Sequence, residues 1–231
     1  MSKFCSASDL KNFGSFPAIL IFGDSTVDTG NNNFIPTITE ANYSPYGKDF
    51  PGHIATGRFS HGKFIPDMVA SKLGIKELVL PFLDPKLSND DAKTGVSFAS
   101  RQIDMSKNYI QRLTRIVGVD ESKKIIGSAL VILSVGTNDF TKNFYDLAVR
   151  KLQYNISGYQ DFIQDRLQNF IKEIYELGCR NIVVAGLPLI GCLPIQETIS
   201  FQPSLKRICL EDQNSDSISY NQKLSKLLGN L

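Results

Sequence analysis

The stretch of sequence that indicates the fold is FPAILIFGDS, residues 16–25. Its first seven residues form a continuous apolar run closed by glycine and aspartate, which is typical of a strand buried on both faces. Similar runs occur at 129–135 and 181–186, and shorter strand-like segments occur at 79–83 and 95–99. Helical patterns alternate with these segments, and that alternation predicts a mainly parallel sheet covered by helices on both faces.

Four segments between and after the strands show helical spacing of their apolar residues. The clearest is 159–177, where the apolar residues fall on one face and Gly178 follows as a stop. For the last helix, Asn214 or Ser215 is the expected N-cap. The other three helices are predicted at 63–73, 103–117 and 214–228.

Length and composition suit one large globular domain. The 231 residues are 42% hydrophobic, and 25 basic against 23 acidic residues leave a formal charge of +2. The charges are scattered, so nothing in the sequence indicates a nucleic acid or an anionic membrane surface as a partner. No run approaches the roughly 18 apolar residues of a membrane span, so no integral membrane segment is expected.

Polar residues follow three of the predicted strands, with GDS at 23–25, FAS at 98–100 and GTND at 136–139. In open parallel sheets, functional residues gather at the carboxyl ends of the strands. Ser25 is a candidate nucleophile whose own N–H helps to stabilise an oxyanion, or else a plain N-cap. Asn138 is a candidate amide donor to an oxyanion, or else a residue that only holds its turn.

Longer motifs surround these residues. They are FGDSTVDTGNNN at 22–33, YGKDFP at 46–51, ATGRFS at 55–60, GVSFAS at 95–100 and GLPLIGCLP at 186–194. Together with GTND, and in this order, they resemble the plant GDSL esterase/lipases, which are members of the SGNH hydrolase superfamily. The resemblance extends over nearly all of residues 16–231.

The resemblance implies a flavodoxin-like three-layer α/β/α fold, in a single domain over 16–231 preceded by a disordered segment at 1–15. It also implies hydrolysis of small-molecule or lipid carboxylic esters through an acyl-enzyme on Ser25, without a metal or cofactor. The family's second block, here called block two, begins with GVSFAS at 95–100. The Ser25 N–H, the N–H of a glycine in block two and the Asn138 amide would form the oxyanion hole. The family is largely secreted, whereas the start of this chain shows no signal peptide.

The chain departs from the family pattern after its last helix. The family carries its catalytic Asp and His in a D-x-x-H block near the C-terminus, and no histidine follows His61 here. We therefore expect a C-terminally truncated member that lacks a strand–helix unit and is a poor esterase, because a serine nucleophile needs a base. His53 and His61 are interpreted as solvated loop residues rather than as that base.

A second departure lies in block two. The family has a glycine-rich turn after FAS, but Arg101 follows here and the next glycine is Gly118, so no block-two oxyanion glycine is identifiable. An alternative is therefore a non-catalytic relative or pseudogene product that binds an ester or glycan without turnover. A flavodoxin-like binding module is disfavoured, because no phosphate-cradling glycine loop follows the first strand.

Cysteines and strand-end aspartates complete the candidates. Cys192 and Cys209 match family positions, and the resemblance predicts a disulfide between them if the protein is secreted. Cys179 follows a helix stop and is expected to be buried and free. Three carboxylates are predicted to hydrogen-bond the strand-end loops rather than to bind a metal, namely Asp24, Asp28 and Asp139.

Overall fold

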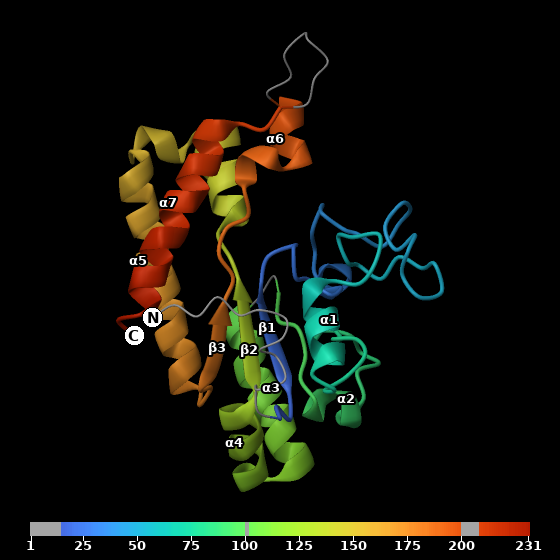
Figure 1. Cartoon of the computed structure of the whole chain (residues 1–231). Helices are drawn as coiled ribbons and strands as arrows, with labels where there is room; N and C mark the ends of the chain where they lie inside the picture. The colour runs from blue at the N-terminus through green and yellow to red at the C-terminus, as the bar shows by residue number, and fades with distance from the viewer. Residues whose placement is uncertain (1–14, 100–101, 200–207) are drawn as a thin grey trace. The chain divides into compact units, whose positions relative to one another are not determined.

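The computed structural model describes residues 15–99, 102–199 and 208–231, and Figure 1 shows its helices and strands. The chain forms two compact units. Unit 1 contains Val135–Lys172 and Ala185–Leu231, and unit 2 contains Phe4–Ser134 and Glu173–Val184. The predicted N-terminal segment, 1–15, lies outside the described residues except for Ser15.

Unit 2 is built on a parallel sheet of three strands, in the order β1 (Ile19–Gly23), β2 (Leu130–Ser134) and β3 (Asn181–Val184). Ile19 pairs with Leu130, and Leu130 pairs with Asn181, so the carboxyl ends of the strands lie at one edge. The three apolar runs therefore form the predicted parallel sheet. β1 is buried at every residue, as its unbroken apolar run predicts.

β3 differs from the buried strand that its sequence predicts. Its residues alternate between exposed and half-buried, and Val183 is 47% exposed. Within the part of the chain that the structure describes, β3 pairs with β2 alone and is an edge strand. An apolar run is consistent with any place in a sheet, because the strand order depends on contacts with residues far along the chain.

Two extended segments continue the sheet on the other side of β1. Ile21 N–H donates to Val96 O over 3.0 Å, and Phe98 N–H donates to Ile21 O over 2.7 Å, so residues 95–98 run alongside β1. A parallel bridge then joins this segment to Pro81. Both short strand-like segments of the sequence therefore lie on that side of β1, although Ser97 joins them through single bridges to Ile21 and to Pro81 rather than through full strands.

Helices cover both faces of the sheet within unit 2. On one face, α1 (Ile65–Lys72) packs into the apolar cluster around Ile19 and Ile21. Because successive strand residues point to opposite faces, Phe22 lies on the other face, with its ring 4.9 Å from Phe98. The Phe98 ring is 5.4 Å from that of Tyr109, which belongs to α3 (Gln102–Val117). This arrangement of helix, sheet and helix agrees with the predicted three-layer α/β/α fold.

Two further helices of unit 2, α2 (Asn89–Lys93) and α4 (Val119–Ser128), were not predicted from the sequence (Figure 1). Lys76 fixes the end of α2, because its Nζ donates to Asp91 O over 3.0 Å and to Gly95 O over 2.9 Å. Burial lowers the pKa of Lys76 to about 8, against an opposing effect of the Asp91 charge. The ammonium group of Lys76 is therefore partly buried, and it joins the end of α2 to the backbone at Gly95.

Unit 1 is helical. The π-helix η3 (Asp139–Asp146) and the 3-10 helix η4 (Arg150–Leu152) lead to the long helix α5 (Ile156–Glu176), and the chain later forms η5 (Ile190–Cys192), α6 (Pro194–Ile199) and α7 (Glu211–Leu228). Gln164 Nε2 on α5 donates to Tyr220 O on α7 over 3.1 Å. The four predicted helices are thus present as α1, α3, α5 and α7. No helix in the described ranges is long and apolar enough to cross a membrane.

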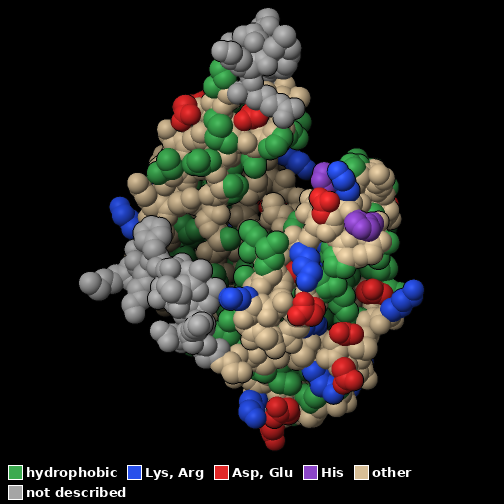
Figure 2. All heavy atoms as spheres, turned by 45° about the vertical axis from the view of Figure 1, so that its right-hand side comes forward, with side chains coloured by type: hydrophobic (Ala, Val, Ile, Leu, Met, Phe, Trp, Pro, Cys, Tyr) green, Lys and Arg blue, Asp and Glu red, His purple; other side chains and the backbone are tan. Residues whose placement is uncertain are grey.

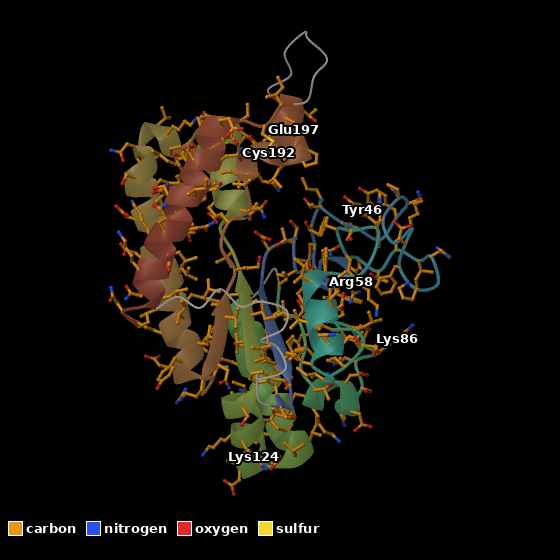
Figure 3. All side chains as sticks on the ribbon, in the orientation of Figure 1. Tyr46, Arg58, Lys86, Lys124, Cys192 and Glu197 are labelled. Carbon is orange, nitrogen blue, oxygen red and sulfur yellow. A yellow bond between two sulfur atoms is a disulfide. The ribbon has the colours of Figure 1, made fainter. Side chains whose placement is uncertain are left out.

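The predicted disulfide between Cys192 and Cys209 is present just before α7 (Figure 3). Cys179 is buried and free, as expected, and burial raises its pKa to about 11. The predicted N-cap of α7 is wrong, because the helix begins at Glu211 with Leu210 as its N-cap. The cause is tertiary, since Leu210 N–H donates to Gly191 O over 2.9 Å and fixes the start of the helix against η5.

Candidate active site

The end of β1 places Ser25 in a tight turn next to β2. A Cβ on Gly23 would lie 2.3 Å from Ser134 O and 2.4 Å from Val27 Cγ2, so the position has no room for a side chain. Asp24 N–H donates to Ser134 O over 3.2 Å and extends the contact with β2 beyond the strand. Ser25 follows, half-buried, at the carboxyl edge of the sheet.

Asp24 shapes the turn that carries Ser25. Its Oδ1 accepts hydrogen bonds from Thr26 N–H over 3.0 Å and from Thr26 Oγ1 over 2.7 Å. Its backbone O accepts from Val27 N–H over 3.1 Å. Asp24 therefore holds the backbone after Ser25, which confirms its predicted role in the loop. The chain turns here without starting a helix, so Ser25 is not a helix N-cap.

The buried carboxylate of Asp28 organises the residues that follow. Its Oδ1 accepts from the N–H groups of Gly30 and Asn31 over 3.0 and 2.7 Å. Its Oδ2 accepts from Asn32 N–H and Asn32 Nδ2 over 3.2 and 3.1 Å. The carboxylate thus binds the loop, as predicted. In the ranges that the structure describes, no three His, Cys, Asp or Glu side chains are grouped to hold a metal ion.

A buried ion pair also holds the loop that follows Ser25. The side chains of Arg58 and Asp67 are 4% and 0% exposed, and two hydrogen bonds of 2.9 and 3.0 Å join them. Arg58, which is labelled in Figure 3, also donates to Thr29 O over 3.1 Å and to Val79 O over 2.8 Å. In the sequence Arg58 stands within the ATGRFS motif, and no local pattern there assigns it a role. Its only signal was a lone arginine in a glycine- and asparagine-rich stretch.

Both histidines lie on the surface of unit 2 (Figure 2). His53 Nδ1 is 2.6 Å from Lys48 O, and His61 O accepts a hydrogen bond from Asp49 N–H over 2.7 Å. These contacts hold a loop together and agree with the interpretation of both histidines as loop residues.

Asn138 lies in unit 1, where the GTND turn leads into η3. Gly136 has φ +107°, a backbone conformation that favours glycine. Phe140 N–H donates to Gly136 O over 3.1 Å, and Thr141 Oγ1 donates to Thr137 O over 2.8 Å, so backbone carbonyls on both sides hold the turn. The half-buried Asn138 is the N-cap residue of η3, but its side chain forms no capping hydrogen bond. Its amide is therefore not used to start the helix.

Tyr220 of α7 lies against this turn. Its hydroxyl oxygen is 3.9 Å from the place that a Cβ on Gly136 would occupy, and its ring is 5.3 Å from that of Phe140. The side chain is buried, and the hydroxyl makes no hydrogen bond with the residues that the structure describes. Burial, with the negative charge of Asp139 as the second cause, raises the pKa of Tyr220 to about 12. Tyr220 therefore stays neutral at physiological pH.

The predicted site residues are thus distributed over both units, with Ser25 in unit 2 and Asn138 in unit 1. Block two ends in Ser100 and Arg101, which lie outside the described residues, so the predicted departure there rests on the sequence.

Comparison with known proteins bears on the same residues. A sequence model described as GDSL-like lipase/acylhydrolase matches residues 19–231. From Arabidopsis thaliana, GDSL esterase/lipase At1g06990 is 51% identical to this chain, over 94% of the chain and 66% of that protein. GDSL esterase/lipase At2g30310 is 55% identical, over 92% of the chain and 65% of that protein. The chain therefore spans about two thirds of the length of these relatives.

A parallel sheet with helices on both faces and a Gly-Asp-Ser turn at the end of β1 define a protein of the SGNH hydrolase fold. More narrowly, the chain belongs to the GDSL lipase/acylhydrolase family.

Proposed function

We propose that this chain carries the nucleophile of a GDSL-type serine esterase that hydrolyses lipid or other acyl esters. The observation that carries the proposal is the turn after β1, in which Asp24 fixes the backbone around a half-buried Ser25. Ser25 Oγ attacks the ester carbonyl and the alcohol leaves, which gives an acyl-enzyme on Ser25. Water then attacks this intermediate, releases the carboxylic acid and restores the serine.

We assign two donors to the oxyanion, the backbone N–H of Ser25 and the side-chain amide of Asn138. Both residues lie within the stretch that the family model matches, which supports this assignment. The unused capping capacity of the Asn138 amide also supports it. We further treat residues 16–231 as one hydrolase domain, because the family match runs without interruption through both units.

The proton acceptor for Ser25 is assigned to a D-x-x-H sequence of the family type, which these 231 residues do not contain. A serine hydroxyl without a base is a weak nucleophile at neutral pH. An oxyanion hole without the rest of a catalytic triad retains a rate of roughly 10³–10⁴-fold over water. The 231-residue polypeptide by itself is therefore expected to be a slow esterase, and a relative that binds an ester or glycan without turnover is the second candidate.

We also propose that the protein reaches an oxidising compartment and is secreted. The disulfide between Cys192 and Cys209 supports this proposal, because such bonds persist outside the reducing cytosol.

The test is hydrolysis of p-nitrophenyl butyrate by the 231-residue chain, by Ser25→Ala and by the control Ser225→Ala. Ser225 is an exposed serine of α7 whose substitution removes the same hydroxyl group elsewhere. We expect slow turnover that is lost in Ser25→Ala alone and that added imidazole, an external base, accelerates. An equal rate in Ser25→Ala would overturn the assignment of the nucleophile. Ester binding without any turnover dependent on Ser25 would favour the second candidate.

A further inference from the structure

Residues 147–152 lie between η3 and α5 in unit 1, and three aliphatic side chains of this loop face solvent. Leu147, Val149 and Leu152 are 68%, 51% and 88% exposed. Single exposed aliphatic residues are normal on protein surfaces, but three within six residues concentrate exposed apolar side chains in one short segment. We call these six residues the 147–152 loop.

The loop is held in shape by its own backbone. Leu147 N–H donates to Lys142 O over 2.8 Å, and Lys151 N–H donates to Ala148 O over 3.1 Å. Ala148 has φ +53°, a left-handed conformation that is uncommon for residues other than glycine. The three exposed aliphatic side chains thus belong to a hydrogen-bonded turn. Ala148, near its start, has a strained backbone conformation of a kind often found at functional sites.

Arg150 and Lys151 belong to the loop, Arg166 of α5 shares an aromatic ring with Arg150, and all three cations lie over rings. Lys151 Nζ lies 4.8 Å from the centre of the Tyr145 ring. The guanidinium groups of Arg150 and Arg166 lie 5.8 and 5.1 Å from the centre of the Phe162 ring. In the part of the chain that the structure describes, none of these three cations forms an ion pair with a carboxylate. Their charge is therefore available to an anionic partner.

We propose that the 147–152 loop docks the protein on a lipid surface with anionic phosphate headgroups. In this arrangement the three aliphatic side chains enter the acyl region, and Arg150, Lys151 and Arg166 face the headgroups. Charge complementarity favours this partner. The cations match the anionic headgroup layer, and the exposed aliphatic side chains match the acyl layer beneath it. The inference is independent of ester hydrolysis, since it concerns binding alone.

The sequence gives no sign of such a surface because its total charge is close to balanced. Two of the cations follow one another along the chain, but Arg166 joins them only because α5 brings it to the same Phe162 ring.

The test measures co-sedimentation of the 231-residue chain with vesicles of phosphatidylcholine alone and of phosphatidylcholine mixed with phosphatidylglycerol. The test variant is Leu147→Ser/Leu152→Ser. The matched control is Ile38→Ser/Ile65→Ser, which removes aliphatic side chains that are 105% and 74% exposed in unit 2. Because all four side chains are exposed, both variants are expected to fold, and circular dichroism checks this.

We expect binding that is stronger on the mixed vesicles and weaker in high salt. The loop variant should lower the partition coefficient by about tenfold or more, because two leucine side chains no longer enter the acyl region of the lipid. The control variant should leave the partition coefficient unchanged. Arg150→Gln/Lys151→Gln should remove the preference for phosphatidylglycerol. Failure of the unaltered chain to bind either vesicle, or equal loss in the control, would overturn the proposal. Dissociation of a homodimer by the loop variant would also overturn it, since a second copy would then be the partner.

Discussion

The buried pair of Arg58 and Asp67 gives the sharpest quantitative test of the structure. Arg58→Met keeps most of the side-chain volume but removes the guanidinium group. Among the described residues, Asp67, whose side chain is 0% exposed, then keeps the N–H groups of Phe64 and Val79 as partners, each at 2.9 Å. Breaking a buried pair on one side typically costs about 3–5 kcal/mol, because it leaves an uncompensated charge.

That cost is a large share of the roughly 5–15 kcal/mol by which a domain is stable. It includes the loss of the bonds from Arg58 to Thr29 O and Val79 O, which tie the loop after Ser25 to the sheet. The double variant Arg58→Met/Asp67→Asn removes the stranded charge as well. It should therefore be more stable than the sum of the two single effects predicts, by about 1–3 kcal/mol.

The assay is urea unfolding followed by far-ultraviolet circular dichroism, because the sequence contains no tryptophan to report by fluorescence. Lys93→Met is the control, since Lys93 and Asp90 form an ion pair of 2.7 Å between side chains that are 41% and 90% exposed. Such a surface pair is worth less than about 1 kcal/mol. If Arg58→Met costs no more than Lys93→Met, or the two single effects simply add, the reasoning about the buried pair is wrong.

Three further predictions concern pH, the disulfide and the oxyanion. Burial lowers the pKa of Lys76 to about 8, against a value near 10.5 in the unfolded chain. Between these two pH values the unfolded state binds more protons than the folded state. The free energy of unfolding should therefore rise with pH, by on the order of 2 kcal/mol. Urea unfolding from pH 7 to 9.5 should show this rise, and Lys76→Met should flatten it; an unchanged slope would contradict the assignment. Cys192→Ser/Cys209→Ser opens a link across 17 residues and should cost about 3 kcal/mol, visible as a lower Tm that dithiothreitol no longer affects. In an active full-length enzyme, Asn138→Ala should lower kcat by about 10²–10³-fold with little change in KM, and a change in KM alone would argue against its role at the oxyanion.

The class of the fold and the motifs can be predicted from local sequence. β1 and β2 were predictable as strands because each is a short continuous apolar run, although such a run does not fix how deeply the strand is buried. α5 was predictable because its period is strong over many residues. The GDS and GTND motifs could be placed at strand ends for the same local reason, and their resemblance to a known family then supplied the expected chemistry.

The tertiary structure alone decided how these local elements are used. The start of α7 is set by Gly191 through Leu210, and local capping signals at Asn214 and Ser215 do not reveal it. The partners of Arg58 are Thr29, Asp67 and Val79, which are separated along the chain and share no local pattern. The position of β3 at the edge of the described sheet depends likewise on strand order. Periodicity and capping report interactions within a few residues, whereas buried charges, sheet order and surface patches arise from contacts between distant segments, which form only when the chain folds.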